Sequence, residues 1–187
     1  MPTIAYDASR AALYTPERHP TLFETERAHT PVQWAVEAAR LAYYRAEESE
    51  AERLRLAEAL GSAGFGAPVF FRDHATFAFG TSNAGDGTAL IAFRGTQPDE
   101  IRHLATNLQA QQTEWSESGG RVHAGFAKAA RSVLPQLREW LGGEVRQHSR
   151  LILAGHSLGA ALATLAATVL QPALTVTLGS PRVGDAD

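Results

Sequence analysis

The sequence predicts an α/β fold in which helices flank a mostly parallel sheet. "RLILAG" (150–155), "SLGAALATLAATVL" (157–170) and "ALTVTLG" (173–179) have the patterns of a strand, a helix and a strand, as in a βαβ unit with a right-handed crossover. Earlier, "ATFAFG" (75–80) alternates and "TALIAF" (88–93) is continuously apolar. These two stretches predict an edge-side hairpin that leads into a central, fully covered strand.

Length and composition place the chain among globular proteins. Its 187 residues are 44% hydrophobic, which is enough for one substantial core. A net charge of -3 disfavours binding to nucleic acid, because it provides no basic field for a polyanion. The absence of cysteine excludes disulfides, thiolate nucleophiles and cysteine zinc sites, and the scattered histidines lack the spacing of a metal site. We expect no metal and no cofactor.

The first 30 residues are expected to form an N-terminal arm, since they are polar, interrupted by proline and without a period. They contain no basic start followed by an apolar stretch, so no signal peptide is recognised, and the default compartment is the cytoplasm. No window approaches the roughly eighteen apolar residues of a transmembrane segment. Residues 31–187 then form a single domain.

Four helices are predicted in addition to the one in the βαβ unit. The first begins at Pro31, and the second spans about 47–61 and opens with acidic residues that suit a helix N-terminus. Two more are expected at about 99–112 and 124–141. We interpret the acids as a solvated helix start rather than as catalytic carboxylates: Glu47, Glu48, Glu50 and Glu52.

Ser157 lies in a Gly-X-Ser-X-Gly motif formed by Gly155, His156, Ser157, Leu158 and Gly159. A strand that ends at this motif and turns at once into a helix holds the serine in a sharp, strained bend, with its hydroxyl raised above the carboxyl edge of the sheet. Such a serine is placed to act as a nucleophile. The alternative is an ordinary glycine-flanked turn in which the serine caps the helix. His156 is expected to pack under the turn, because neighbouring side chains at a strand end point to opposite sides.

Four segments together resemble the class 3 lipase family of α/β-hydrolases: "IAFRGT" (91–96), "VHAGF" (122–126), "GHSLGAALATLAA" (155–167) and "TLGSPRVGD" (177–185). The resemblance implies a serine ester hydrolase acting on lipid esters. It assigns Ser157 as the nucleophile, Thr96 (amide and hydroxyl) and Leu158 (amide) to the oxyanion hole, and a structural role to the histidine of "VHAGF". For Thr96, the alternative is a loop threonine that caps the following helix.

The same resemblance places a candidate lid after Thr96, with Ile101, Leu104 and Leu108 on one face, where it would touch a lipid interface transiently. A plain surface helix docked on the core would give the same pattern. The sequence does not distinguish a triacylglycerol lipase from a phospholipase A1, a monoacylglycerol lipase or a short-chain esterase. The head group and the acyl chain of the substrate are therefore left open.

The acid and the base of a catalytic triad are not found after the serine. Members of this fold family place them in the order serine, acid, histidine, and no histidine follows Ser157. Asp185 and Asp187 come too early and belong to the "PRVGD" turn. We therefore expect a working lipase truncated at its C-terminal end, with this polypeptide inactive or nearly so. The alternative is a complete, catalytically inactive remnant that binds acyl ligands or a partner through an open strand edge.

Overall fold

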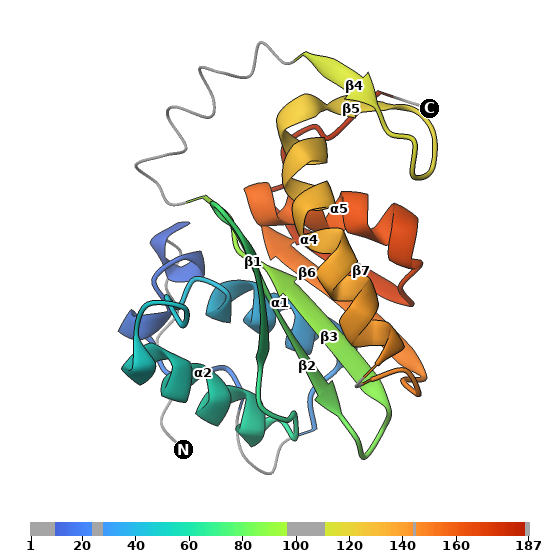
Figure 1. The fold of residues 1–187 in the computed structure, drawn as a ribbon. Coiled ribbons are helices and arrows are strands. Elements are labelled where there is room, and N and C mark those ends of the chain that lie inside the picture. The colour runs from blue at the N-terminus through green and yellow to red at the C-terminus, as the bar shows by residue number, and fades with distance from the viewer. Residues whose placement is uncertain (1–9, 24–27, 97–110, 144, 186–187) are drawn as a thin grey trace.

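The computed structural model describes residues 10–23, 28–96, 111–143 and 145–185 (Figure 1). One sheet has the strand order β1-β2-β3-β6-β7, and β4 and β5 form a separate two-stranded ribbon. The strands are β1 (Val69–Asp73), β2 (Thr76–Asn83), β3 (Thr88–Phe93), β4 (Gln112–Glu114), β5 (Arg121–His123), β6 (Arg150–His156) and β7 (Leu174–Leu178). The helices are η1 (Arg10–Leu13), η2 (Pro16–Arg18), α1 (Pro31–Leu41), α2 (Glu50–Ser62), α4 (Ala124–Gly142) and α5 (Leu158–Leu170).

The sheet is mixed. β1, β2 and β3 pair antiparallel, whereas β3, β6 and β7 pair parallel. β3 is buried along its whole length, and β6 is buried from Leu151 to Gly155, because helices cover both faces. This arrangement confirms the predicted βαβ unit formed by β6, α5 and β7 and the central position of β3.

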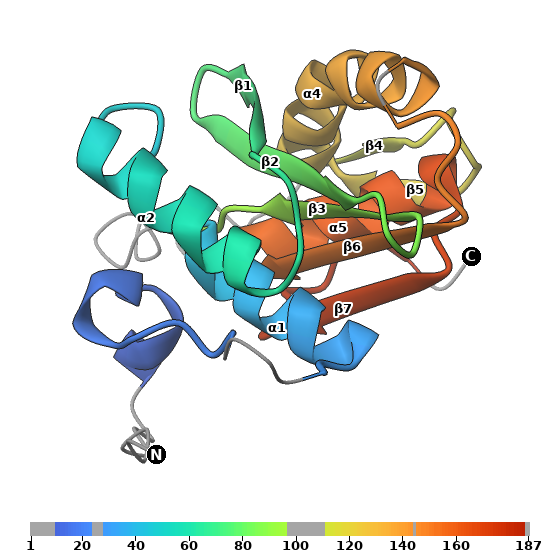
Figure 2. The same cartoon turned by 90° about the horizontal axis from the view of Figure 1, so that it is seen from below.

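Helices lie on both faces of the sheet (Figure 2), and each face carries its own apolar core. α4 and α5 cover one face, where Phe93, Phe126 and Trp140 are among the buried side chains. α1 and α2 cover the other, where Phe79, Leu90 and Ile152 are buried. The helix predicted at 124–141 is continuous through Pro135 and ends at Gly142. The expected helix at 99–112 falls mostly outside the described residues, and Gln112 begins β4 instead.

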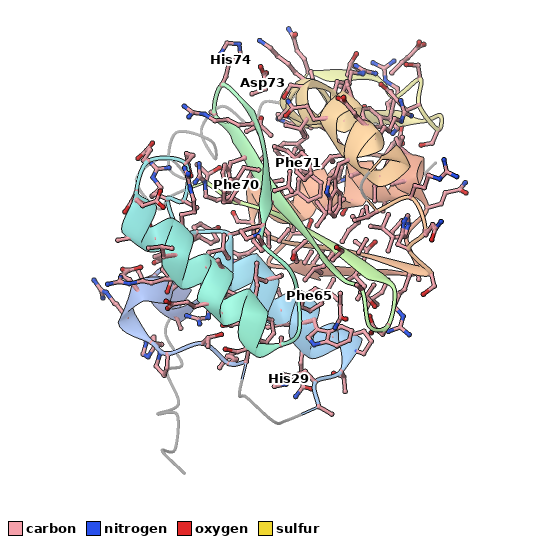
Figure 3. The ribbon with its side chains drawn as sticks, turned by 60° about the horizontal axis from the view of Figure 1, so that its bottom comes forward. His29, Phe65, Phe70, Phe71, Asp73 and His74 are labelled. Atoms are coloured by element: carbon pink, nitrogen blue, oxygen red, sulfur yellow. The ribbon has the colours of Figure 1, made fainter. Side chains whose placement is uncertain are left out.

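The outermost strand, β1, was not predicted. Figure 3 shows its labelled aromatic pair, Phe70 and Phe71, and the turn at Asp73 and His74 that leads into β2. Phe71 is 2% exposed and meets the Trp140 ring at 5.6 Å between centroids, while Phe70 packs against the opposite core. β1 pairs with β2 along all five of its residues. The expected hairpin, formed by β2 and β3, therefore does not lie at the edge of the sheet, because β1 covers its outer side.

The described part of the N-terminal segment is bound to α1 through a buried ion pair. Arg40 donates to both carboxylate oxygens of Glu37, each at 2.7 Å, and also to the carbonyl oxygens of Pro16 (3.3 Å) and Pro20 (3.2 Å). Glu37 is fully buried, and it also accepts hydrogen bonds from the hydroxyl of Thr21 and the N–H of Leu22. These bonds satisfy the buried charges, so residues 10–23 pack on α1 although their sequence lacks a period. The domain boundary at residue 30 stays a prediction.

Two glycines allow the backbone of the β6–α5 turn to pack without any gap. A Cβ on Gly155 would lie 2.1 Å from the carbonyl oxygen of Gly159. A Cβ on Gly159 would lie 2.2 Å from the carbonyl oxygen of Phe93, at the end of β3. Both distances are far below van der Waals contact, and the atoms concerned are backbone atoms that no side-chain rotation can move. The first turn of α5 can therefore contact the end of β3 only if these positions are glycine.

This packing predicts the effect of Gly159→Ala. The added methyl group meets the backbone of β3, so the free energy of unfolding should fall by about 3 kcal/mol or more, at the upper end of overpacking costs. Gly61→Ala in α2 is the matched control, since a Cβ there has nothing within 4 Å. It should stabilise the protein by roughly 0.5–1 kcal/mol. Urea unfolding curves measure both changes, and a loss below 1 kcal/mol in Gly159→Ala would contradict this description of the turn.

Candidate active site

Ser157 occupies the turn between β6, which ends at His156, and α5, which begins at Leu158. Its backbone has φ 56° and ψ -122°, a conformation that non-glycine residues rarely adopt and that costs of order 1–3 kcal/mol. The Ser157 N–H donates to the carbonyl oxygen of Leu178 at 2.9 Å, which fixes the turn to the end of β7. Its side chain makes no capping hydrogen bond. The structure therefore gives no support to the interpretation of Ser157 as a helix cap.

Thr96 lies in the segment that follows β3, beside the turn of Ser157. A Cβ added to Gly159 would collide with the backbone of Phe93 and Arg94. The backbone segments that carry Thr96 and Leu158 are therefore in direct contact. Within the part of the chain that the structure describes, the Thr96 hydroxyl oxygen is buried and has no hydrogen-bond partner. A buried hydroxyl without a partner costs about 1–3 kcal/mol, so Thr96 keeps an unused hydrogen-bonding group at this position. The Leu158 amide is the first of α5, where amides lack intrahelical partners.

His156 packs beneath the turn, and its ring contacts a residue that the sequence did not single out. The Tyr43 hydroxyl and His156 Nδ1 are 2.8 Å apart, and Nε2 faces the Gly179 backbone. Burial lowers the pKa of His156, which favours the neutral ring. Nδ1 is thus engaged by Tyr43, and a supporting rather than a catalytic role for His156 remains a prediction.

Glu47 corrects one sequence-based expectation. α2 begins at Glu50 with Ser49 as its cap, and Glu50 is 72% exposed, as expected of a solvated helix start. Glu47 precedes the cap and is buried instead. Its Oε1 lies 2.6 Å from Arg94 Nη1, with the two side chains 7% and 10% exposed. The Arg94 guanidinium also lies 4.3 Å above the Phe77 ring. This ion pair anchors the segment that leads to Thr96. The pattern of charges in the sequence does not reveal it, because Arg94 lies far from Glu47 along the chain.

The remaining candidates lie elsewhere. His123 caps α4, because its Nδ1 accepts from the N–H groups of Gly125 (3.1 Å) and Phe126 (3.3 Å), which fits a structural role. Asp185 accepts from the N–H of Arg121 at 3.1 Å and belongs to the turn that pairs with β5. The candidate lid residues Ile101, Leu104 and Leu108, as well as Asp187, lie outside the described residues.

The described residues include no group of three or more histidines, aspartates or glutamates that could hold a metal ion. None of the described helices has the length and apolar character needed to cross a membrane. A hollow of about 470 Å³ lies at the opposite end of the sheet, lined in part by Thr88 and His148, and it includes none of the candidate site residues.

Comparison with known proteins connects these features to a family. The family model described as lipase (class 3) matches residues 90–187, which is more than half of the chain and includes Thr96, His123 and Ser157. Phospholipase A(1) DAD1, chloroplastic, from Arabidopsis thaliana is 32% identical over 128 residues, covering 56% of this chain and 29% of the relative. Secreted mono- and diacylglycerol lipase 1 from Fusarium solani is 34% identical over 103 residues, covering 51% of this chain and 30% of the relative.

Solved structures agree with the sequence comparisons. A crystal structure of an MDLA mutant from Penicillium cyclopium is 28% identical and superposes with a TM-score of 0.64, covering 82% of this chain and 62% of that one. Solved fungal lipases share the sheet and its covering helices, so the fold is that of the α/β-hydrolases. The chain spans about a third or less of the length of the two curated relatives. The chain belongs to the class 3 lipase family.

Proposed function

We propose that this protein is a serine ester hydrolase that acts on lipid esters and that Ser157 is its nucleophile. The observation that carries the proposal is the strained Ser157 turn, whose side chain makes no capping bond, packed against the segment of Thr96. The buried, unpartnered Thr96 hydroxyl supports it. The names of the two curated relatives, a phospholipase A(1) and a mono- and diacylglycerol lipase, support lipid esters as the substrate class.

The proposed reaction is a two-step acyl transfer. The Ser157 hydroxyl oxygen attacks the ester carbonyl carbon while a base takes its proton, and the carbonyl oxygen becomes an oxyanion. The amides of Thr96 and Leu158 and the Thr96 hydroxyl donate hydrogen bonds to that oxyanion. Collapse of the tetrahedral intermediate transfers the proton to the leaving alcohol and leaves an acyl-enzyme on Ser157. Water then attacks the acyl-enzyme and releases the fatty acid.

A base and an acid must complete this mechanism, and residues 158–187 include no histidine. The coding sequence after the Asp187 codon tests this part of the proposal. Read in the same frame, it should continue into a segment with an aspartate or glutamate followed by a histidine. A stop codon directly after Asp187 would contradict the triad and favour a non-catalytic acyl-binding protein. The oxyanion hole alone would then leave at most a residual rate, many orders of magnitude lower.

Ser157→Ala tests the nucleophile in the protein expressed with that downstream segment. The substitution removes the attacking oxygen, so hydrolysis of p-nitrophenyl butyrate and of emulsified acylglycerols should fall by about 10⁶-fold. Ser62→Ala is the control, because the exposed Ser62 hydroxyl on α2 donates to the carbonyl oxygen of Glu58 in its own helix. Its rate should equal that of the wild type. Residual activity in Ser157→Ala above a hundredth of the wild-type rate would assign the chemistry to another residue.

Thr96→Val tests the oxyanion hole through the hydroxyl alone. Valine retains the amide and the shape of threonine but cannot donate from its side chain, so kcat should fall by roughly 10²- to 10³-fold. Thr96→Ser restores the hydroxyl and should recover kcat to within a few-fold of the wild type. Steady-state kinetics on a water-soluble ester separates kcat from KM. Equal rates in the valine and serine variants would show that the Thr96 hydroxyl takes no part in stabilising the oxyanion.

A further inference from the structure

Tyr43 brings together three segments that are far apart in the sequence. It follows the last turn of α1 and is 3% exposed. Its hydroxyl is 2.8 Å from His156 Nδ1 in the turn of Ser157. The same oxygen also lies against Gly95 in the segment of Thr96, where an added Cβ would come within 2.1 Å of it and within 2.3 Å of the carbonyl oxygen of His156. One phenol oxygen therefore contacts both backbone segments of the candidate site.

The protonation states of these groups favour one direction for the hydrogen bond between Tyr43 and His156. Burial raises the pKa of Tyr43 well above its ordinary value, so the phenol keeps its proton. The phenol has one hydrogen to donate, and His156 Nδ1 is the acceptor within reach. Burial also lowers the pKa of His156, so its ring is neutral and can accept at Nδ1. The Tyr43 hydroxyl is therefore assigned as the donor to His156 Nδ1, while the same oxygen lies against Gly95.

We infer that Tyr43 is a positioning residue for ester hydrolysis, which holds the segment of Gly95 and Thr96 at a fixed separation from that of His156, Ser157 and Leu158. The inference rests on the proposed function of Ser157. The two halves of the proposed oxyanion hole are attached to different strands, β3 and β6. An oxyanion needs both halves at about 2.7–3.1 Å at the same time. Because the Tyr43 hydroxyl contacts both segments, it fixes the distance between the two halves before the substrate binds.

The inference is specific to one hydroxyl. Neighbouring Tyr44 is also buried, but among the described residues its hydroxyl bonds to the carbonyl oxygen of Pro16, at 3.5 Å, on the N-terminal segment. Arg94 and Glu47 support the Thr96 segment from another side, as an ion pair that Tyr43→Phe leaves in place. Tyr43→Phe and Tyr44→Phe therefore remove the same atom from adjacent positions of one helix end, and only the first removal touches the site.

The test compares these two variants in the protein expressed with its downstream segment. Tyr43→Phe should lower kcat on p-nitrophenyl butyrate by about 10- to 100-fold with KM changed less than about twofold, because positioning errors below 1 Å already cost rate. Affinity for phenylboronic acid, which forms a tetrahedral adduct with the serine, should fall by the same factor. Tyr44→Phe should leave both constants within about twofold of the wild type. A Tyr43→Phe kcat within twofold of the wild type, or equal losses in the two variants, would overturn the inference.

Two further measurements distinguish a failure of the inference about Tyr43 from a failure of the proposed function. If Ser157→Ala keeps its activity, the proposed function fails. If Ser157→Ala is inactive and Tyr43→Phe is not impaired, only the inference about Tyr43 fails. The imidazole ¹⁵N spectrum of wild-type protein needs no turnover and no folded variant: the inference expects His156 with the proton on Nε2 and an unprotonated Nδ1. A His156 ring with its proton on Nδ1 would overturn the assignment of Tyr43 as the donor in this hydrogen bond.

Discussion

The structure around Ser157 depends on one steric constraint, the contact between the backbone of the β6–α5 turn and the end of β3. Gly155 and Gly159 permit it, and each would place a Cβ within about 2 Å of backbone atoms if it were any other residue. This contact sets the first turn of α5 against Phe93 and so brings the segment of Thr96 beside that of Leu158. The positive φ of Ser157 follows from the same bend, since the chain must reverse within a single residue.

α1 supports this turn from the other side of the sheet. The buried polar groups of α1 and of the residues just after it bind two different parts of the chain. Glu37 and Arg40 bind the N-terminal segment, while Tyr43 contacts His156 and Gly95. Glu47, shortly after α1, fixes Arg94. Each group has a partner far away in the sequence, and each lies where an unpaired charge or hydroxyl would be costly. A helix that forms one wall of the core therefore also carries the supports of the proposed site.

The sequence predicted those parts of the fold that repeat locally. The apolar runs of β3 and β6, the period of α4 and the glycine spacing around Ser157 all lie within single segments, and the structure has them where expected. β1 was missed because five residues with two adjacent aromatics show a weak alternation. Glu47 and Tyr43 were missed for a different reason. Their partners, Arg94 and His156, lie 47 and 113 residues away, and only the fold brings them together.

The N-terminal segment illustrates the same difference. Its composition indicates an arm that lies over the surface or is partly disordered, and residues 10–23 pack on α1 through Arg40, which donates to backbone carbonyls that no periodic pattern reveals. Sequence patterns therefore predict an element well when its structure depends on its own residues. They predict poorly the packing of several segments around a buried charge. The proposed site belongs to both cases, since its nucleophile lies in a local motif and its supports come from distant segments.

The central claim is that Ser157 attacks an ester carbonyl whose oxygen is held by Thr96 and Leu158. The most direct measurement is a crystal structure of the protein, expressed with its downstream segment, after reaction with an alkyl fluorophosphonate. We expect phosphorus bonded to the Ser157 hydroxyl oxygen and the phosphoryl oxygen within hydrogen-bond distance of both amides and of the Thr96 hydroxyl. An adduct on another residue, or a phosphoryl oxygen directed away from Thr96 and Leu158, would contradict the account.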